Sequence, residues 1–351
     1  SGPNVTEALA AAAVQPGTDA WIARAVLSGA VGRAAAMLAR LSTSPVAAAA
    51  SADEMPRGCS AEVLADLVFA LGVTAAGTGP TDDPGGLGHH AADAVGVFVT
   101  RAAAGRTTWF DIALLAGLAD RCDLRRLLGD ADVRAACGTV LTAAGHTAGD
   151  RAIPASWRKL AIRLLGTALR QGDAALAAEA REALQTVLAT AGEPDLKRAA
   201  VAALVSGADA AAAAAIVEAL PAFEPAVRTA AVTALLDRNE TAAALLAAIE
   251  AKALSPAVVP LERRAALEAA TDPAVRAAAG RIWAHAASPG LSAEEVESLL
   301  ATVRRGGLAA HGRDIFLKNC ASCHQVSGAG HLVGPALAEA VERPIEQLVM
   351  D

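Results

Sequence analysis

The chain has 351 residues, of which 54% are hydrophobic but only 3% are aromatic, with no tyrosine. Alanine carries this excess, which favours closely packed helices over thick sheet cores. The formal net charge is −7 and no basic stripe is visible, so nucleic acid is not an expected partner, because phosphate binding requires clustered cations. The alanine-rich stretch around residues 210–215 is interrupted by Asp209 and Glu218, so no clean run of about 20 apolar residues predicts a transmembrane segment.

The first predicted domain, residues 1–150, is an irregular series of helices. One helix is expected to start at Asp19, and a long helix is expected over residues 62–72. Trp21 and Trp283 are expected to pack in the core. Residues 76–88 are rich in Gly, Pro and Asp, so the sequence predicts a loop near residues 76–90.

His89 and His90 stand in sequence beside Asp82 and Asp83. Together they could bind a metal ion, but adjacent residues in a loop rarely converge on one ion. A solvated loop is therefore the preferred interpretation.

Four aligned segments predict a repeated helix start. Each opens with an acidic residue, and in three of them proline follows at a first-turn position, where its missing N–H costs nothing. Apolar residues then recur at i, i+3, i+4, i+7 and i+8, so one face of each helix is expected to be buried. The segments are DADVRAAC (130–137), EPDLKRAA (193–200), EPAVRTAA (224–231) and DPAVRAAA (272–279).

These starts, with intervening helices such as the one expected over residues 241–252, resemble HEAT repeats, which stack antiparallel helix pairs into a solenoid. The resemblance implies an all-α fold, with HEAT-like helices over residues 1–150 and a HEAT-repeat solenoid over residues 151–306. A capping box at Ser292–Glu295 is expected to open the last solenoid helix, and Gly306-Gly307 to end it.

The most specific motif is Cys320-Ala-Ser-Cys323-His324, the CxxCH spacing by which a chain attaches a c-type haem. Two cysteines three residues apart lie within one helical turn, so both sulfurs can reach the vinyl groups on one edge of a porphyrin. His324 then brings an imidazole under the iron. Its other ring nitrogen needs an acceptor, and the carbonyl of Pro335 is a candidate.

CxxC has two other interpretations. A thioredoxin-like dithiol normally lies in a fold of alternating strands and helices, and a zinc site normally needs a second pair of ligands elsewhere in the chain. Cys59, Cys122 and Cys137 show no such pairing. Haem attachment is therefore preferred.

The flanking residues carry a second resemblance. Gly312-Arg-Asp-Ile-Phe316 before the motif and Val333-Gly-Pro335-Ala-Leu337 after it resemble the small c-type cytochrome domain, in which a Gly-Pro supplies the carbonyl that orients the proximal histidine. These residues resemble one group more closely. It is the haem-binding domain at the C-terminus of large secreted proteins that carry a dehydrogenase-like β-propeller and a central HEAT region. Asp19-Ala-Trp21 is similar to a repeat start of that family, and Arg343–Asp351 is similar to the start of a further helix of its haem-binding domain.

The resemblance implies that residues 307–351 are the N-terminal part of a c-type cytochrome domain and that the chain is a fragment. In such domains the sixth iron ligand, often a methionine, lies far downstream of CxxCH. Met350 occupies an ordinary apolar position of the family pattern and is not the expected ligand, and His331 is expected to be exposed. The sixth ligand stays unassigned.

The remaining cysteines suggest no chemistry of their own. Cys137 falls on the apolar stripe of its helix, so a small buried hydrophobe is expected. A disulfide between Cys122 and Cys137 is allowed in an oxidising compartment but is not preferred.

Two functions follow from these observations. The first is a haem c electron-transfer module on a HEAT scaffold, working with a redox partner or a dehydrogenase domain in a larger protein. The second is a non-redox scaffold that binds a protein partner on the solenoid surface. No catalytic constellation is visible, so an enzyme activity is not assigned. The start Ser-Gly-Pro has no signal-peptide pattern, and a periplasmic or exported location is implied by the haem motif alone.

Overall fold

The computed structural model describes residues 3–49, 54–55, 60–77, 89–207, 210–284, 293–321 and 324–331, together with residues 337 and 345. They belong to two compact units, Ser1–Gly280 and Arg281–Asp351. Helices dominate both units, and the described residues contain one short two-stranded ribbon. The all-α prediction is confirmed, while the domain boundaries expected after residues 150 and 306 stay predictions.

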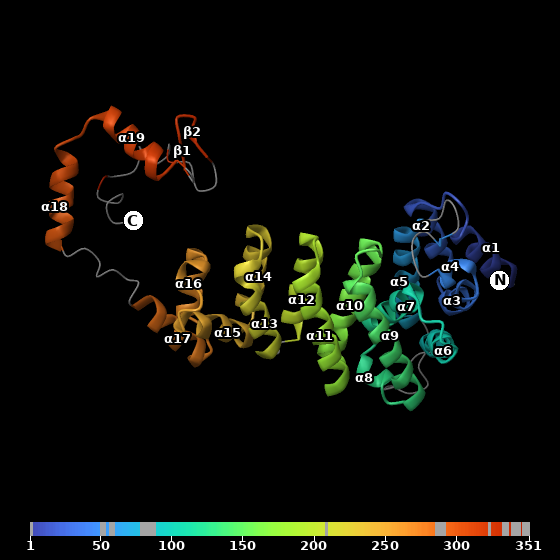
Figure 1. Ribbon diagram of the computed structural model, residues 1–351. Coiled ribbons are helices and arrows are strands. Elements are labelled where there is room, and N and C mark those ends of the chain that lie inside the picture. The colour runs from blue at the N-terminus through green and yellow to red at the C-terminus, as the bar shows by residue number, and fades with distance from the viewer. Residues whose placement is uncertain are drawn as a thin grey trace. The chain divides into compact units, whose positions relative to one another are not determined.

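The first unit is a row of helices (Figure 1). Its helices of eight residues or more are α1 (Pro3–Ala13), α2 (Ala20–Gly29), α3 (Ala34–Ser42), α5 (Ala61–Gly77), α6 (His89–Ala103), α7 (Trp109–Arg121), α9 (Ala131–Gly149), α10 (Ala155–Gln171), α11 (Ala174–Thr190), α12 (Pro194–Ser206), α13 (Ala210–Ala219), α14 (Pro225–Leu236), α15 (Asn239–Glu250), α16 (Leu261–Glu268) and α17 (Pro273–Ala284), the last of which crosses the boundary between the units. Short α4 (Pro45–Ala48), α8 (Leu124–Leu127), η1 (Leu220–Ala222) and η2 (Pro256–Val258) connect some of them.

From α9 to α15 the helices form two layers. Alternate helices pack side by side, with α9, α11, α13 and α15 in one layer and α10, α12 and α14 in the other. Helices that follow one another along the chain also pack together, as α9 does with α10 and α11 with α12. This arrangement buries one stripe of each helix between the layers, as the repeated apolar spacing requires.

All four predicted helix starts are confirmed. Asp130 and Asp272 cap α9 and α17, and one carboxylate oxygen of each accepts hydrogen bonds from two backbone N–H groups of the first turn. Glu193 and Glu224 precede α12 and α14 without such side-chain bonds. Proline fills the first helical position in both of these helices, which leaves one fewer N–H to satisfy.

The predicted apolar stripes are buried. In α9 the stripe contributes Cys137 and Val140, both with no exposed surface, and in α12 it contributes Leu196 and Leu204, which are equally enclosed. Trp283 is buried, as expected, with 5% of its surface exposed.

The prediction for Trp21 is wrong, because 76% of its surface is exposed. The inward stripe of α2 runs through Val26 and Leu27. Trp21 precedes Val26 by five residues, which at 100° per residue places it well away from that stripe. Arg24 instead lies over its ring, at 5.6 Å from the guanidinium carbon to the ring centroid.

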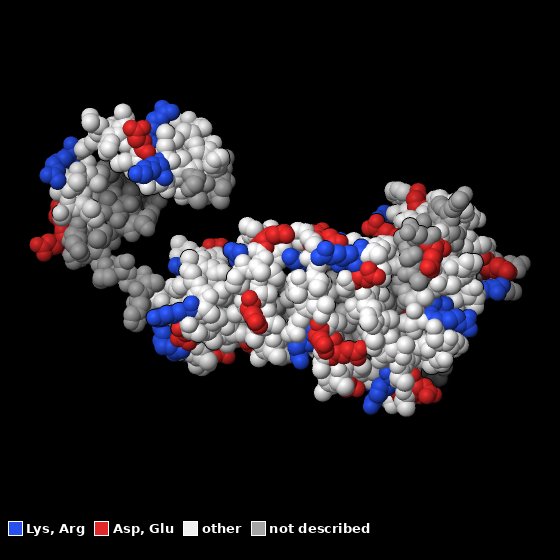
Figure 2. Space-filling view, viewed as in Figure 1, with Lys and Arg blue, Asp and Glu red and all other residues white. Residues whose placement is uncertain are grey.

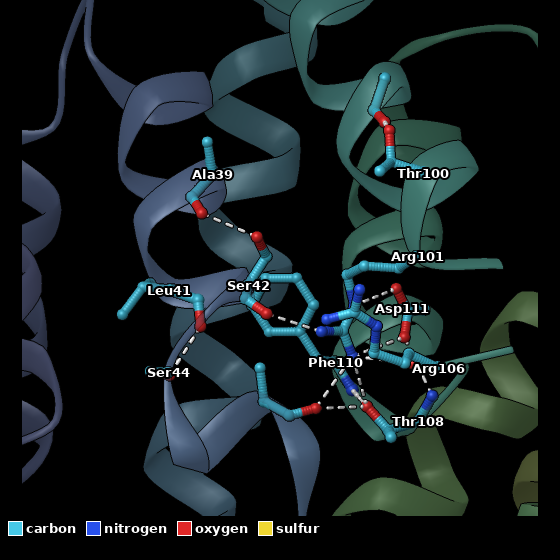
Figure 3. Close-up of polar contacts among 12 residues, drawn as sticks. Ala39, Leu41, Ser42, Ser44, Thr100, Arg101, Arg106, Thr108, Phe110 and Asp111 are labelled. Atoms are coloured by element: carbon cyan, nitrogen blue, oxygen red, sulfur yellow. Dashed lines mark hydrogen bonds and ion pairs between the residues drawn. The ribbon is translucent and has the colours of Figure 1, made fainter. Parts of the chain in front are cut away.

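A buried ion pair joins α6 to α7 (Figure 3). Arg101 Nε donates to Asp111 Oδ1 over 2.7 Å, and its terminal nitrogens donate to the carbonyls of Ser42, Ala47 and Arg106. The backbone N–H of Thr108 donates to the other oxygen of Asp111 over 2.9 Å. Both charges are therefore saturated with hydrogen bonds, which is what burial of an ion pair demands.

The second unit holds α18 (Ala293–Arg304), α19 (Ala309–Asn319), β1 (Gln325–Val326) and β2 (Ala329–Gly330). Gly306, two residues after the end of α18, has φ +76 and donates its N–H to the carbonyl of Val303 over 2.9 Å, so the predicted glycine stop is confirmed. Ser292 of the expected capping box lies outside the described residues. None of the described helices in either unit has the length and apolar character needed to cross a bilayer.

Candidate functional site

Helix α19 leads directly into the CxxCH motif. The backbone N–H groups of Cys320 and Ala321 both donate to the carbonyl of Phe316, over 2.8 and 3.0 Å, and so close the helix. Cys320 occupies the C-cap position with a half-buried free thiol. The helix end thus fixes the backbone from which the first thiol projects.

One further turn brings His324 back to Cys320. The N–H of His324 donates to the carbonyl of Cys320 over 2.9 Å, a spacing of four residues that closes a helix-like turn. His324 is half-buried and Ala321, between the two, is 8% exposed. The turn therefore holds the first cysteine and the histidine of the motif in one small, partly enclosed segment.

A hairpin packs back against this turn. Strands β1 and β2 pair antiparallel, with Gln325 opposite Gly330 and Val326 opposite Ala329. Ser327 (φ +48) and Gly328 (φ +80) make the two-residue turn between them, a geometry that matches the twist of a hairpin. The N–H of His331 then donates to the carbonyl of Ala321 over 3.0 Å and attaches the hairpin to the motif.

Gly330 is the point of closest approach. A Cβ at this position would lie 2.1 Å from the carbonyl oxygen of His324 and 3.1 Å from that of Ala321, and φ is +94. Only glycine allows this contact without displacing the backbone. Residue-by-residue interpretation of the sequence missed this role, although the Ser-Gly pair in the preceding turn is a signal for a turn.

The described part of the site fits a c-type haem. A thiol and an imidazole are carried on one turn, and these groups attach the porphyrin and ligate its iron. Apolar side chains stay open to solvent on the helix that ends at this turn, with Ile315 49% and Leu317 46% exposed. The two side chains are two residues apart and lie on opposite sides of the helix, so a porphyrin, which is a large apolar disc, would cover one of them.

Other predicted residues of the site fall outside what the structure describes. Cys323, Pro335 and Met350 are among them. His331 is exposed, as expected.

A CxxCH motif that directly follows the end of a helix is typical of the haem-attachment segment of a c-type cytochrome. Residues 309–347 match the family model of cytochrome c. The C-terminal part of the chain is thus a cytochrome c domain, a module that binds haem c covalently and transfers electrons. No curated protein matches the chain.

The structure does not support the other sites considered from the sequence, a Cys122–Cys137 disulfide and a metal site at His89 and His90. Cys122 and Cys137 are both free thiols, and burial raises the pKa of Cys137 to about 12, which leaves it protonated and unreactive. His89 and His90 begin helix α6 rather than lying in a loop, while Asp82 and Asp83 lie outside the described residues. Where side chains are described, no group of three or more His, Cys, Asp or Glu is arranged to hold a metal ion.

Proposed function

We propose that this chain is an electron-transfer module in which a HEAT-repeat scaffold precedes the cytochrome c domain. Bound haem c supplies one-electron redox chemistry at its iron. The thiols of Cys320 and Cys323 each add across one vinyl group, the sulfur bonding to one vinyl carbon and a proton going to the other. His324 ligates the iron, and the carbonyl of Pro335 accepts a hydrogen bond from its second ring nitrogen.

The turn from Cys320 to His324 is the observation that carries this proposal. It holds the thiol and the imidazole on one partly buried segment, closed by a 2.9 Å backbone hydrogen bond. The family match spans Cys320, Cys323, His324 and Pro335 together. Both lines of support concern the second unit alone.

The larger context of the proposal rests on different observations. The two-layer packing of α9 to α15 and the repeated helix starts with an acidic N-cap residue support HEAT repeats in the first unit. Cytochrome c domains are typically exported or periplasmic, which supports that location for this chain. Its redox partner would be a dehydrogenase-like domain of the same protein or a separate protein, as the sequence resemblance implies.

The test is a pyridine haemochrome spectrum of the chain expressed with c-type haem maturation. We expect a c-type spectrum whose haem stays with the protein in acidified organic solvent. The double variant Cys320→Ala, Cys323→Ala should lose this covalent haem. His324→Ala should change the absorption spectrum of the protein recorded without pyridine, because its imidazole no longer ligates the iron.

Cys122→Ser is the matched control, because it removes a half-exposed thiol of the other unit and should leave haem content unchanged. Covalent haem that survives the double substitution, or an unaltered spectrum in His324→Ala, would refute the assigned roles.

A protein-interaction scaffold without redox function is the second candidate. The length of the helical row in the first unit favours it, since stacked helix pairs present extended binding surfaces. It predicts a colourless protein with a saturable protein partner even after haem maturation, whereas the electron-transfer module is red.

A further inference from the structure

The sequence shows no basic stripe, but the structure corrects this, because helix α10 presents a narrow one on the first unit. Most of the helix is buried, and from residue 159 onward its exposed positions are Lys159, Arg163 and Arg170. Spacings of four and seven residues place all three on one face of the helix. Figure 2 shows Lys and Arg atoms gathered over the part of this unit formed by α10 and α12, with acidic atoms beside them.

The stripe borders a hollow between α10 and α12, here called the α10 groove. Three cations and one carboxylate line it, with a volume of about 430 Å³; its polar residues are Asp120, Lys159, Arg163, Thr167, Arg170, Gln171 and Ser206. A second hollow of about 590 Å³ on the α5 side shares Lys159 and Arg163 but is also lined by Glu62 and Asp66. Cations therefore exceed carboxylates in the α10 groove and not in this second hollow.

Small residues form the apolar floor of the α10 groove. Gly166, Ala199, Ala202 and Ala203 line it. A Cβ on Gly166 would lie 2.8 Å from that of Ala203, so the two helices meet closely there. Such a floor lets an incoming main chain approach while leaving the charges at the rim.

The cations of the α10 groove are only partly neutralised. Arg163 pairs with Asp120 and lies 4.4 Å from the centroid of Phe69, which holds its planar guanidinium in place. Arg170, in contrast, donates to two neutral hydroxyls, Oγ of Ser206 over 2.9 Å and Oγ1 of Thr167 over 3.1 Å.

Two more arginines approach from neighbouring elements. Arg238 donates to the carbonyl of Ser206 over 3.5 Å, and Arg125 donates to the carbonyl of Arg170 over 3.1 Å. Burial, and then the positive charges of Arg163 and Arg238, lower the pKa of Arg170, while Asp120 has a smaller opposite effect. Positive potential at Arg170 therefore exceeds what the nearby carboxylate compensates.

We propose that the α10 groove docks an acidic segment of a protein partner, with carboxylates at the cationic rim and small side chains on the alanine floor. Charge complementarity is the reason. The chain as a whole has a formal net charge of −7, which repels an acidic partner. The cations of the α10 groove attract it instead, and this difference orients its approach. A nucleic acid fits less well, because a phosphate backbone needs a longer track of cations.

The proposal concerns the first unit and does not depend on haem loading. Its test is fluorescence anisotropy of the full chain with a labelled eight-residue peptide of alternating Glu and Ala. The matched peptide has Gln in place of Glu. We expect saturable binding of the acidic peptide alone, weakened by added salt.

Lys159→Gln and Arg170→Gln should each weaken binding about fivefold, the scale of one exposed ionic contact. Lys252→Gln, which removes one exposed charge beyond α15, should leave the affinity unchanged. Bound peptide should also shield Lys159 from amine acylation in the unsubstituted protein, a readout that needs no variant to fold.

Three results would overturn the proposal. They are equal binding of the Gln peptide, equal weakening by Lys252→Gln, and unaltered acylation of Lys159 at saturating peptide. Binding of single-stranded DNA with no binding of the acidic peptide would assign the groove to nucleic acid instead.

Discussion

Individual ion pairs differ widely in how much they contribute to the stability of the fold, and the difference depends on how deeply each pair is buried. Asp111 is fully enclosed and Arg101 nearly so, and each has several hydrogen-bond partners. Arg198 and Asp195 form an ion pair too, but with 44% and 60% of their side chains exposed. Water screens the second pair and is excluded from the first.

Asp111→Ala should therefore lower the free energy of unfolding by about 3–5 kcal/mol, because it leaves the charge of Arg101 buried without its partner. Urea unfolding followed by circular dichroism measures this. Arg198→Ala is the control, with an expected loss of no more than about 1 kcal/mol. Similar losses in both variants would contradict the structural role given to the buried pair.

At the haem-attachment turn, Gly330→Ala should disturb the motif through sterics. The added Cβ would lie 2.1 Å from the carbonyl oxygen of His324, so either the hairpin or the turn must shift. We expect less covalent haem per chain, measured by pyridine haemochrome against protein concentration.

Gly328→Ala separates this contact from simple backbone strain. Its φ is also positive, at +80, but a Cβ there meets no atom within 4 Å. It should cost about 1–3 kcal/mol of local strain while leaving haem content close to that of the parent chain. Equal haem loss in both glycine variants would show that the close approach is unimportant.

Among the elements, a recurrent arginine links five of the helices to the helix end or connection before them. It stands four residues after the N-cap of α9, α10, α14, α16 and α17, and its guanidinium donates to carbonyls at the preceding helix end or connection. These arginines are Arg134, Arg158, Arg228, Arg264 and Arg276. Helix ends leave carbonyls without partners, and a cation there also complements the helix dipole.

Arg228 illustrates the energetic consequence, since it donates to the carbonyls of Leu220, Pro221 and Phe223. Arg228→Ala should lower the free energy of unfolding by about 1–3 kcal/mol, as expected when polar groups lose a charged donor. Arg228→Lys should restore only part of the lost free energy of unfolding, because an ammonium group lacks the forked donors of a guanidinium. If the lysine variant were as stable as the unsubstituted protein, the positive charge of Arg228 alone, and not its guanidinium geometry, would account for its effect.

The helix starts and apolar stripes were predictable because they depend on local rules of capping and periodicity. Asp130 and Cys137 behave as those rules require. Trp21 shows where local rules fail: its pattern resembled a core position, yet the inward stripe of α2 passes elsewhere. The packing of the neighbouring helices decides which face of a helix is buried.

For the whole molecule, division into two compact units predicts that damage to one interior stays within that unit. Leu204 is completely buried in the first unit. Leu204→Ala should lower that unit's free energy of unfolding by about 2–5 kcal/mol, the usual range for a truncated core leucine. Haem content per chain should not change, and a parallel loss of haem would show that the units are not separate.

The sequence by itself determined the helical class, the four recurring helix starts and the haem-attachment motif, because each depends on residue spacing within a single turn or helix. Only the tertiary structure decided which charges pair inside the first unit, where the cations of α10 gather, and how closely Gly330 approaches His324. Arg101 and Ser42 are 59 residues apart in the chain yet hydrogen-bonded. Contacts of that kind depend on how whole helices pack, and no local pattern of residues encodes them.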